Sequence, residues 1–270
     1  MIGSQAFVRI SKGFPAGLAM AVLMMLSSGA IAGTITYSPA LTDDASTGIS
    51  TAKTYTHTVS GGTAAWVNGV YFDRLNASYT PANFDWDTNG YSKNSIDFNY
   101  GLWDPASGGV TGPDLINLLW SFTFSSDGQE YPAFQTFTLS GLTPGETYDA
   151  RIYIRVWDIE GTGRQISIKY INGPAGDATG TLGLYEDSPS SMGYDSDHMA
   201  YYVNYQYTAQ TSYLAIEAHV PQSSISQSGS FFMYALSNEV VSAVPLPSSL
   251  LLGASGLVGI LLIRRQRRSG

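Results

Sequence analysis

Apolar and polar residues alternate through much of the middle of the chain. The clearest case is ETYDARIYIRVWD, in which every second residue from Tyr148 to Val156 is apolar. The intervening positions hold Asp149, Arg151, Tyr153, Arg155 and Trp157. A period of two is typical of a β-strand whose two faces meet different surroundings. We therefore predict a strand here with one face on the core and the other face able to meet solvent.

The segment before this strand reads as another strand and a turn. FQTFTLS carries Phe134, Phe137 and Leu139, and the following residues include Pro144 and Gly145. Proline fixes φ and glycine admits positive φ, so this pair favours a tight turn. We predict two neighbouring strands joined at that turn.

Further short strands are predicted along the chain, with turn residues between them. A single helical stretch is indicated by GPDLINLLW, where Pro113 occupies a first-turn position. No internal repeat and no alternation of strands with helices is visible, which favours an all-β sandwich or barrel. The predicted strands are Thr54–Ser60, Ala65–Phe72, Ser121–Ser125, Arg164–Ile171, Thr179–Tyr185, Met199–Thr208, Tyr213–Val220 and Phe231–Leu236.

The N-terminal residues have the build of a secretory signal peptide. Arg9 and Lys12 precede the apolar run Leu18–Ala30, and Ala30 and Ala32 supply the small residues that a signal peptidase reads. The run is shorter than the ~20 residues that span a bilayer. We predict a signal peptide over residues 1–32 and a mature chain that begins at Gly33.

Charge is distributed unevenly between the middle of the chain and its ends. Residues 33–242 contain all 21 acidic residues and seven of the 13 basic residues, so their net charge is 7 − 21 = −14. Such a charge repels phosphate backbones and argues against nucleic acid as a partner. The chain contains no cysteine, so an exported domain must depend on core packing, to which its 18 Tyr, 11 Phe and 5 Trp contribute.

The C-terminal stretch AVPLPSSLLLGASGLVGILLIRRQRRSG joins an apolar run to a basic tail. Leu246–Ile263 spans 18 residues, which is borderline for a bilayer, and the run is interrupted by Pro247 and three glycines. These features favour a transient membrane helix. The arginines after it hold the tail in the cytoplasm, so the preceding domain faces outward.

This terminus resembles the PEP-CTERM sorting signal of exopolysaccharide-producing Gram-negative bacteria. Val244, Pro245 and Pro247 match the proline motif, and Leu246 stands between the prolines where the family usually has Glu. The basic tail consists of Arg264, Arg265, Arg267 and Arg268. The resemblance implies a sorting segment over residues 243–270, recognition by an exosortase in the inner membrane, and release or attachment at the cell surface.

A second resemblance concerns residues 33–242. SGISTAKTYTHTVSGGTAAWVNGVYF, FTLSGLTPGETYDARIYIRVWD and GSFFMYALSNEVV look like segments of surface proteins with a galactose-binding-like, jelly-roll sandwich. The LSGLTPGETY turn also resembles the tyrosine corner of fibronectin-type sandwiches. These likenesses imply a jelly-roll β-sandwich and name no ligand.

Two acidic stretches are candidates for calcium. DWDTNG places Asp85, Asp87, Asn89 and Gly90 as in the first half of an EF-hand-like loop, but Ile96 stands where a bidentate Glu should close the site. The alternative is an ordinary turn between strands. The second stretch, YEDSPSSMGYDSDHM, is either a solvated loop or a set of converging ligands. Calcium is the only cofactor that the sequence suggests.

Candidate glycan chemistry gathers near the end of the alternating strand. Tyr153, Arg155 and Trp157 would suit a glycan, because aromatic rings stack on sugars and arginine binds hydroxyls. The alternative is that these aromatic side chains fill the core or cover a second sheet. Asp158 and Glu160 beside Trp157 are the carboxylate pair that a glycosidase needs. No nucleophile elbow, HExxH zinc motif or phosphate-binding glycine loop occurs.

These observations predict a non-catalytic protein of the extracellular matrix. We expect a structural or glycan-binding component of a biofilm or exopolysaccharide matrix. The alternative is a polysaccharide-acting enzyme, either a glycoside hydrolase or a lyase.

Overall fold

The computed structural model divides the chain into two units, Met1–Ala32 and Gly33–Gly270. It describes residues 33–96, 109–126, 134–155, 165–173, 178–185, 200–219 and 230–241, all in the second unit. The predicted signal peptide, the sorting segment with its membrane helix, Trp157 and the Asp158–Glu160 pair lie outside the described residues. Within the described ranges, no helix is long and apolar enough to cross a membrane.

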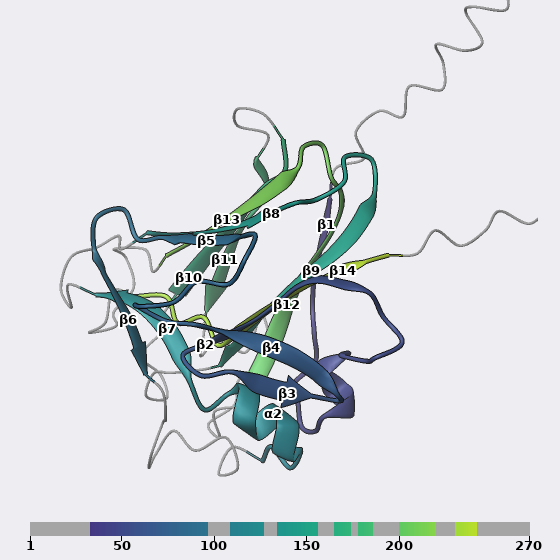
Figure 1. The fold of residues 1–270 in the computed structure, drawn as a ribbon, viewed down its shortest axis with the longest axis vertical. Coiled ribbons are helices and arrows are strands. Elements are labelled where there is room, and N and C mark those ends of the chain that lie inside the picture. Colours follow the sequence, from purple (N-terminus) through teal and green to yellow (C-terminus); the bar gives the residue numbers. More distant parts are fainter. Residues whose placement is uncertain are drawn as a thin grey trace, which may run out of the picture. The chain divides into compact units, whose positions relative to one another are not determined.

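Seven strands form the larger sheet (Figure 1). Its neighbours pair antiparallel, except that β2 and β4 run parallel. From one edge to the other, the strands are β1 (Thr34–Tyr37), β12 (Ala200–Thr208), β9 (Thr147–Arg155), β14 (Ala235–Val240), β2 (Tyr55–Gly61), β4 (Val70–Leu75) and β3 (Ala65–Val67).

A second, antiparallel sheet has five strands, and a further pair of strands stands apart from both sheets (Figure 1). The described chain also contains one 3₁₀ turn, η1 (Ala45–Thr47), and one helix, α2 (Pro113–Leu118). The five strands are, in order, β11 (Ala178–Tyr185), β10 (Gln165–Ile171), β13 (Tyr213–His219), β8 (Gln135–Ser140) and β5 (Phe84–Asp87), and the pair is β6 (Ser92–Ile96) and β7 (Phe122–Ser126).

The main core lies between the seven-stranded and five-stranded sheets. Ile152 of β9 and Tyr205 of β12 belong to the same buried cluster as Ile168 of β10 and Phe137 of β8. Tyr205 stacks on Tyr170 of β10 with 4.4 Å between ring centroids. Close packing of two sheet faces defines a β-sandwich. The prediction of an all-β sandwich is therefore confirmed.

A second core covers the opposite face of the seven-stranded sheet. Leu115 and Leu118 of α2 pack there with Leu41, Ile49 and Tyr153. The sheet is thus buried on both faces near β9, and every residue of that strand after Thr147 is buried. The expected alternation of core and solvent on β9 is wrong, because residues 41–55 and α2 cover the second face.

The turn before β9 closes through a tyrosine. The backbone N–H of Thr143 donates to the Tyr148 hydroxyl at 2.9 Å, and Gly145 has φ of +89°. Tyr148 is buried in the main core. This is the geometry of a tyrosine corner, so the resemblance of LSGLTPGETY to that motif is confirmed.

Several predicted elements differ from the structure in informative ways. The predicted strand Ala65–Phe72 is a hairpin, in which β3 and β4 are joined by Asn68 at φ +48° and Gly69 at φ +78°. Two successive positive φ angles define a type I′ turn. Strands β1, β5 and β6 were not expected from the pattern, and the strand predicted over Phe231–Leu236 begins only at Ala235.

Candidate functional site

The β3–β4 hairpin presents an exposed pair of aromatic rings at one edge of the seven-stranded sheet. Trp66 and Tyr71 face each other across the hairpin, with ring centroids 5.1 Å apart. Their side chains are 59% and 44% exposed. Alternate residues of the same strands, including Val67 and Phe72, point into the second core. The core thus holds the backbone that presents the outer rings.

The hairpin turn is tied to the layer that covers the sheet. The backbone N–H of Asn68 donates to the Asp114 carboxylate of α2 at 2.9 Å. Its side-chain amide donates to the carbonyls of Asp44 and Ile49 at 2.8 and 3.0 Å. Asp44 in turn accepts the Leu115 N–H at the start of α2 at 2.8 Å. These bonds hold the hairpin in one position relative to the helix.

Tyr79 adds a third aromatic ring after β4. Asn76 and Tyr79 exchange backbone hydrogen bonds of 3.0 and 3.2 Å, which turns the chain back on itself. The Tyr79 hydroxyl donates to Asp73 Oδ2 at 2.8 Å, and the ring is 37% exposed. This bond to a carboxylate raises the pKa of Tyr79 above its ordinary value of 10.0, so the phenol stays protonated at neutral pH.

Arg74 lies over the ring of Tyr79. The centre of its guanidinium is 4.9 Å from the ring centroid, which is a cation–π distance. The backbone N–H of Arg74 donates to Asp73 Oδ1 at 2.9 Å. No carboxylate of the described chain lies within 4.0 Å of the guanidinium nitrogens. The site therefore contains an oriented cation that has no ion-pair partner among these residues.

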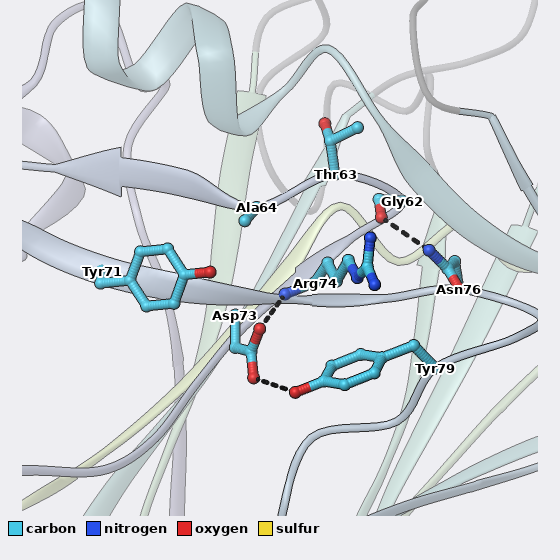
Figure 2. Close-up of a pocket in the computed structure, with 8 residues that line it drawn as sticks. All are labelled: Gly62, Thr63, Ala64, Tyr71, Asp73, Arg74, Asn76 and Tyr79. Carbon is cyan, nitrogen blue, oxygen red and sulfur yellow. Dashed lines mark hydrogen bonds between the residues drawn. The ribbon is translucent and has the colours of Figure 1, made fainter.

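These side chains surround a pocket of about 440 Å³ (Figure 2). Figure 2 shows the Asp73 carboxylate between the Tyr79 hydroxyl and the backbone of Arg74. The volume falls within the range of about 300–1,000 Å³ typical of small-molecule sites. We call this the hairpin pocket; it is lined by Gly62, Thr63, Ala64, Tyr71, Asp73, Arg74, Asn76 and Tyr79.

A second pocket adjoins the first. It has a volume of about 310 Å³ and shares Thr63 and Ala64 with the hairpin pocket. Trp66 lines it from β3, and Asp114 and Asn117 line it from α2. The exposed surface therefore continues from Tyr79 across the hairpin to α2. It offers aromatic faces and polar groups from both pockets.

The glycan-binding strip predicted on β9 is not on the surface. Tyr153 is 0% exposed and Arg155 is 1% exposed. The Tyr153 hydroxyl donates to the Thr47 carbonyl at 2.9 Å, and the ring packs edge-on against Phe72. No sugar can stack on a ring enclosed in this way. The prediction is wrong for Tyr153 and Arg155, and Trp157 lies outside the described residues.

The predicted calcium ligands lie in a strand and a turn. Asp85 and Asp87 are exposed residues of β5, paired with Thr138 and Thr136 of β8. Asp87 Oδ1 accepts the Asn89 N–H at 2.9 Å, and Asn89 has φ of +59°. In the described ranges, no three His, Asp or Glu side chains gather as a metal site would require. This geometry favours the turn alternative, and calcium binding stays a prediction.

Buried charges gather on the covered face of the large sheet. Arg151 Nη2 lies 3.0 Å from both Asp149 Oδ2 and Glu239 Oε1. Lys53 donates to Glu239 at 3.0 Å and to the Gly48 carbonyl at 2.8 Å. Arg151 Nη1 also donates to the Gly48 carbonyl, at 3.1 Å. We call these four ionic side chains the Arg151 cluster; they fasten residues 48–53 to the sheet.

The Arg151 cluster borders a third pocket, of about 280 Å³. Asp149 and Glu239 line it and stand opposite each other on β9 and β14. Both carboxylates contact the Arg151 guanidinium, and Lys53 also contacts Glu239. The cluster therefore links β9 and β14 to residues 48–53.

Comparisons with known proteins identify distant folds only. No family model and no curated protein matches the chain. Solved structures that are similar include the plant receptor-like kinase ANX2 (8% identity, TM-score 0.46) and the ANXUR2 extracellular domain from Arabidopsis thaliana (10%, 0.44). In both cases the alignment covers 70% of this chain and 49% of the other, so the chain spans about half their length.

A further similar structure is the K1 cleaved adhesin domain of Lys-gingipain from Porphyromonas gingivalis W83. It shares 9% identity at a TM-score of 0.35, over 60% of this chain and 89% of that domain. TM-scores at this level identify no shared function. The site must therefore be judged from its own residues.

The predicted strand Ala65–Phe72 gave no indication of the hairpin pocket, although the sequence contains a signal for the hairpin itself. Asn68-Gly69 within the alternating run AWVNGVYF is the dipeptide that most favours a two-residue hairpin. Such a hairpin places Trp66 directly opposite Tyr71. No sequence pattern indicates that Tyr79 folds back onto Asp73, because that contact depends on the irregular turn after β4.

Proposed function

We propose that this protein is an exported, non-catalytic component of an extracellular polysaccharide matrix, and that it binds glycan at the hairpin pocket. The observation that carries the proposal is the exposed Trp66–Tyr71 pair beside the oriented Asp73, Arg74 and Tyr79 side chains. Aromatic rings bind the apolar C–H faces of sugars, while charged groups bind the hydroxyls. The hairpin pocket combines both kinds of group on one open surface.

The rigidity of the pocket supports a binding role. Tyr79 is held by Asp73, Arg74 is held over Tyr79, and the hairpin is held by Asp114 and Asp44. Side chains that are already ordered lose little entropy when a ligand arrives. Binding of a glycan would therefore cost little side-chain entropy at this surface.

Export and sorting form the second part of the proposal. They rest on the signal-peptide features of residues 1–32 and on Val244–Pro247 with the arginines that follow. We expect an exosortase to act on the chain in the inner membrane, before the domain reaches the cell surface or matrix. Mass spectrometry of the surface protein from a host with and without its exosortase tests this. An intact basic tail in both strains would contradict it.

The topology supports the jelly-roll part of the proposal. From β8 onward, successive strands pass between the two sheets: β8 and β13 lie in the five-stranded sheet, whereas β9, β12 and β14 lie in the seven-stranded sheet. Among the described strands of this stretch, β10 and β11 are the consecutive pair that stays in a single sheet. Repeated crossing between two antiparallel sheets is the pattern of jelly-roll sandwiches.

A glycan array with the purified domain, residues 33–242, tests the binding proposal. We expect Tyr71→Ala and Trp66→Ala to weaken binding to any glycan that is retained, because each removes a stacking surface. Tyr213→Ala is the matched control, since Tyr213 is 37% exposed on β13 and does not line the hairpin pocket. Equal loss in all three variants, or no retained glycan, would contradict the proposal.

The same glycans test the enzyme alternative. Their chain length should stay constant during incubation with the domain, as measured by size-exclusion chromatography. A fall in chain length that Asp149→Asn abolishes would instead place catalysis at the Arg151 cluster.

A further inference from the structure

We infer that the glycan bound at the hairpin pocket is acidic, and that Arg74 binds the carboxylate of a uronic acid residue. This inference rests on the proposed glycan-binding function and names its substrate class. It follows from an inventory of the hydrogen-bonding groups that line the pocket.

The acceptors of the pocket are largely engaged within the protein. Asp73 accepts the Arg74 N–H through Oδ1 and the Tyr79 hydroxyl through Oδ2. Asn76 Oδ1 accepts the backbone N–H and the hydroxyl of Ser78 at 3.1 and 3.0 Å. Thr63 Oγ1 shares a hydrogen bond of 3.0 Å with Ser121. Each Asp73 oxygen keeps one further lone pair, so the acceptor capacity left for a ligand is reduced.

The donors of the pocket are concentrated in Arg74. Its guanidinium carries five N–H groups, and no carboxylate of the described chain lies within ion-pair distance. The cation–π contact with Tyr79, at 4.9 Å from the ring centroid, uses none of those groups. A planar fork of donors matches a carboxylate, which accepts two parallel hydrogen bonds. The complementary ligand is therefore an anion with paired oxygens.

A uronic acid satisfies the rest of the pocket as well. Its pyranose ring has an apolar C–H face for an aromatic side chain, and its carboxylate projects from the rim of the ring. Tyr71 and Tyr79 supply the aromatic surfaces within reach of the same pocket. One sugar residue can thus engage a tyrosine and Arg74 together.

The charge of the whole domain makes this inference sharply testable. Residues 33–242 carry a net charge of −14, so they have no general attraction for a polyanion. At physiological salt, charges are screened over about 8 Å, so the local contact at Arg74 decides binding. Retention of an acidic polymer by this domain must therefore come from a defined site.

Isothermal titration calorimetry of residues 33–242 with matched oligosaccharides tests the inference. The probes are oligogalacturonate, oligomannuronate and hyaluronan oligomers, each beside a carboxyl-reduced, neutral form of the same oligomer. We expect at least one acidic probe to bind about tenfold more tightly than its neutral form, the gain of a charge-assisted contact. Arg74→Gln should abolish that preference, so that the acidic probe and its neutral form bind the variant with similar affinities.

Two further variants separate the outcomes. Arg74→Lys keeps the charge but loses the planar fork, so it should retain only part of the preference. Lys93→Gln is the matched control, because Lys93 lies over Trp86 and outside the hairpin pocket. Melting temperatures of all variants show whether each one is folded.

The possible results are distinct for the two proposals. Equal binding of acidic and neutral forms, a preference that survives Arg74→Gln, or no binding to any of the acidic probes overturns the inference about acidic glycans. The binding proposal itself fails if the glycan array also retains nothing, or if Tyr71→Ala, Trp66→Ala and Tyr213→Ala weaken binding equally. A neutral glycan that binds through Tyr71 would leave the proposed function intact while overturning the acidic preference.

Discussion

Strand β9 and the β3–β4 hairpin carry similar side chains in opposite settings. Tyr153 with Arg151 on β9, and Tyr71 with Arg74 on β4, each combine an aromatic ring with a guanidinium within a few residues. Tyr153 is 0% exposed, whereas Tyr71 is 44% exposed. Strand β9 lies inside the sheet, under α2 and residues 41–55, whereas the hairpin forms the edge of the same sheet.

The difference shows what burial does to the same chemistry. On β9, Arg151 forms ion pairs with Asp149 and Glu239. The Tyr153 hydroxyl donates to the Thr47 carbonyl. Buried polar groups must be paired in this way, because an unpaired one costs free energy. At the hairpin, solvent satisfies the guanidinium, so it stays available to a ligand. Position in the sheet, and not residue type, separates the structural pair from the candidate binding pair.

Replacing the two tyrosines by alanine gives the largest contrast. Tyr153→Ala should lower the free energy of unfolding by about 3–5 kcal/mol, because it leaves a cavity in a closed core. Tyr71→Ala should change it by less than about 0.5 kcal/mol and weaken glycan binding instead. Urea denaturation measures the first effect, and titration calorimetry measures the second. Similar free energies of unfolding for the two variants would contradict the distinction between a structural Tyr153 and a ligand-binding Tyr71.

Arg151→Ala tests the Arg151 cluster. Removing the guanidinium leaves Asp149 buried without its ion-pair partner, while Lys53 still neutralises Glu239. The expected loss is about 3 kcal/mol, near the lower end for breaking a buried ion pair. For a domain of this size, that corresponds to a fall in Tm of about 6–12 °C. Arg74→Ala is the exposed counterpart and should leave Tm nearly unchanged.

Gly69→Ala tests whether the hairpin turn positions the pocket. Gly69 has φ of +78°, and a new Cβ would lie 3.1 Å from Thr51 Cγ2. Strain of this kind costs about 1–2 kcal/mol, and the displaced rings should bind glycan less well. Gly145→Ala is the control, since Gly145 has φ of +89° and open space around it. Should both variants bind equally well, the turn does not position the site.

Acidification should destabilise the contact between β2 and the five-stranded sheet through His57, which lies beside Asn83 and Phe84. Burial lowers the pKa of His57 below 6.5, although its bond to the Asn83 carbonyl opposes the shift. The unfolded chain therefore takes up a proton at a higher pH than the folded chain does. Stability present above pH 6.5 is lost as the pH falls from there toward the folded pKa.

Denaturation of wild type and His57→Gln at pH 7.5 and 5.5 measures this effect. The variant should lose less stability between the two values. His219 contributes in the same direction, because partial burial lowers its pKa too, so His219→Gln is the companion variant. An identical pH dependence in wild type and His57→Gln would rule out the buried histidine as its source.

Calcium should give the smallest effect. Asp85 and Asp87 are exposed residues of β5, and their carboxylates do not surround a common metal position with a third acidic or histidine side chain of the described residues. We expect millimolar calcium, or EDTA, to shift Tm by less than about 1 °C, measured by differential scanning fluorimetry. A larger, saturable rise that Asp87→Asn abolishes would restore the calcium site predicted from DWDTNG.

Local patterns predicted most strands, but not how the layers cover one another. Alternation located β8, β9, β12 and β13 to within two residues at each end, and Pro144-Gly145 marked the tyrosine corner. The alternation on β9 predicts one solvent-facing side, but both sides are buried. Polar residues that form ion pairs beneath a second layer give the same sequence pattern as polar residues in contact with solvent. Leu115 and Leu118 belong to that layer. Their position over the sheet depends on tertiary packing, which the local sequence pattern does not specify.

The place of β14 in the sheet has a consequence for the export that we propose. This last described strand lies in the middle of the large sheet, between β9 and β2. A chain that crosses a membrane N-terminus first cannot complete this sheet until residues 235–240 emerge. Pairings so distant in sequence also form slowly. The translocating polypeptide would thus stay unfolded enough to pass through a narrow channel, and insertion of β14 between β9 and β2 would complete the sheet on the far side.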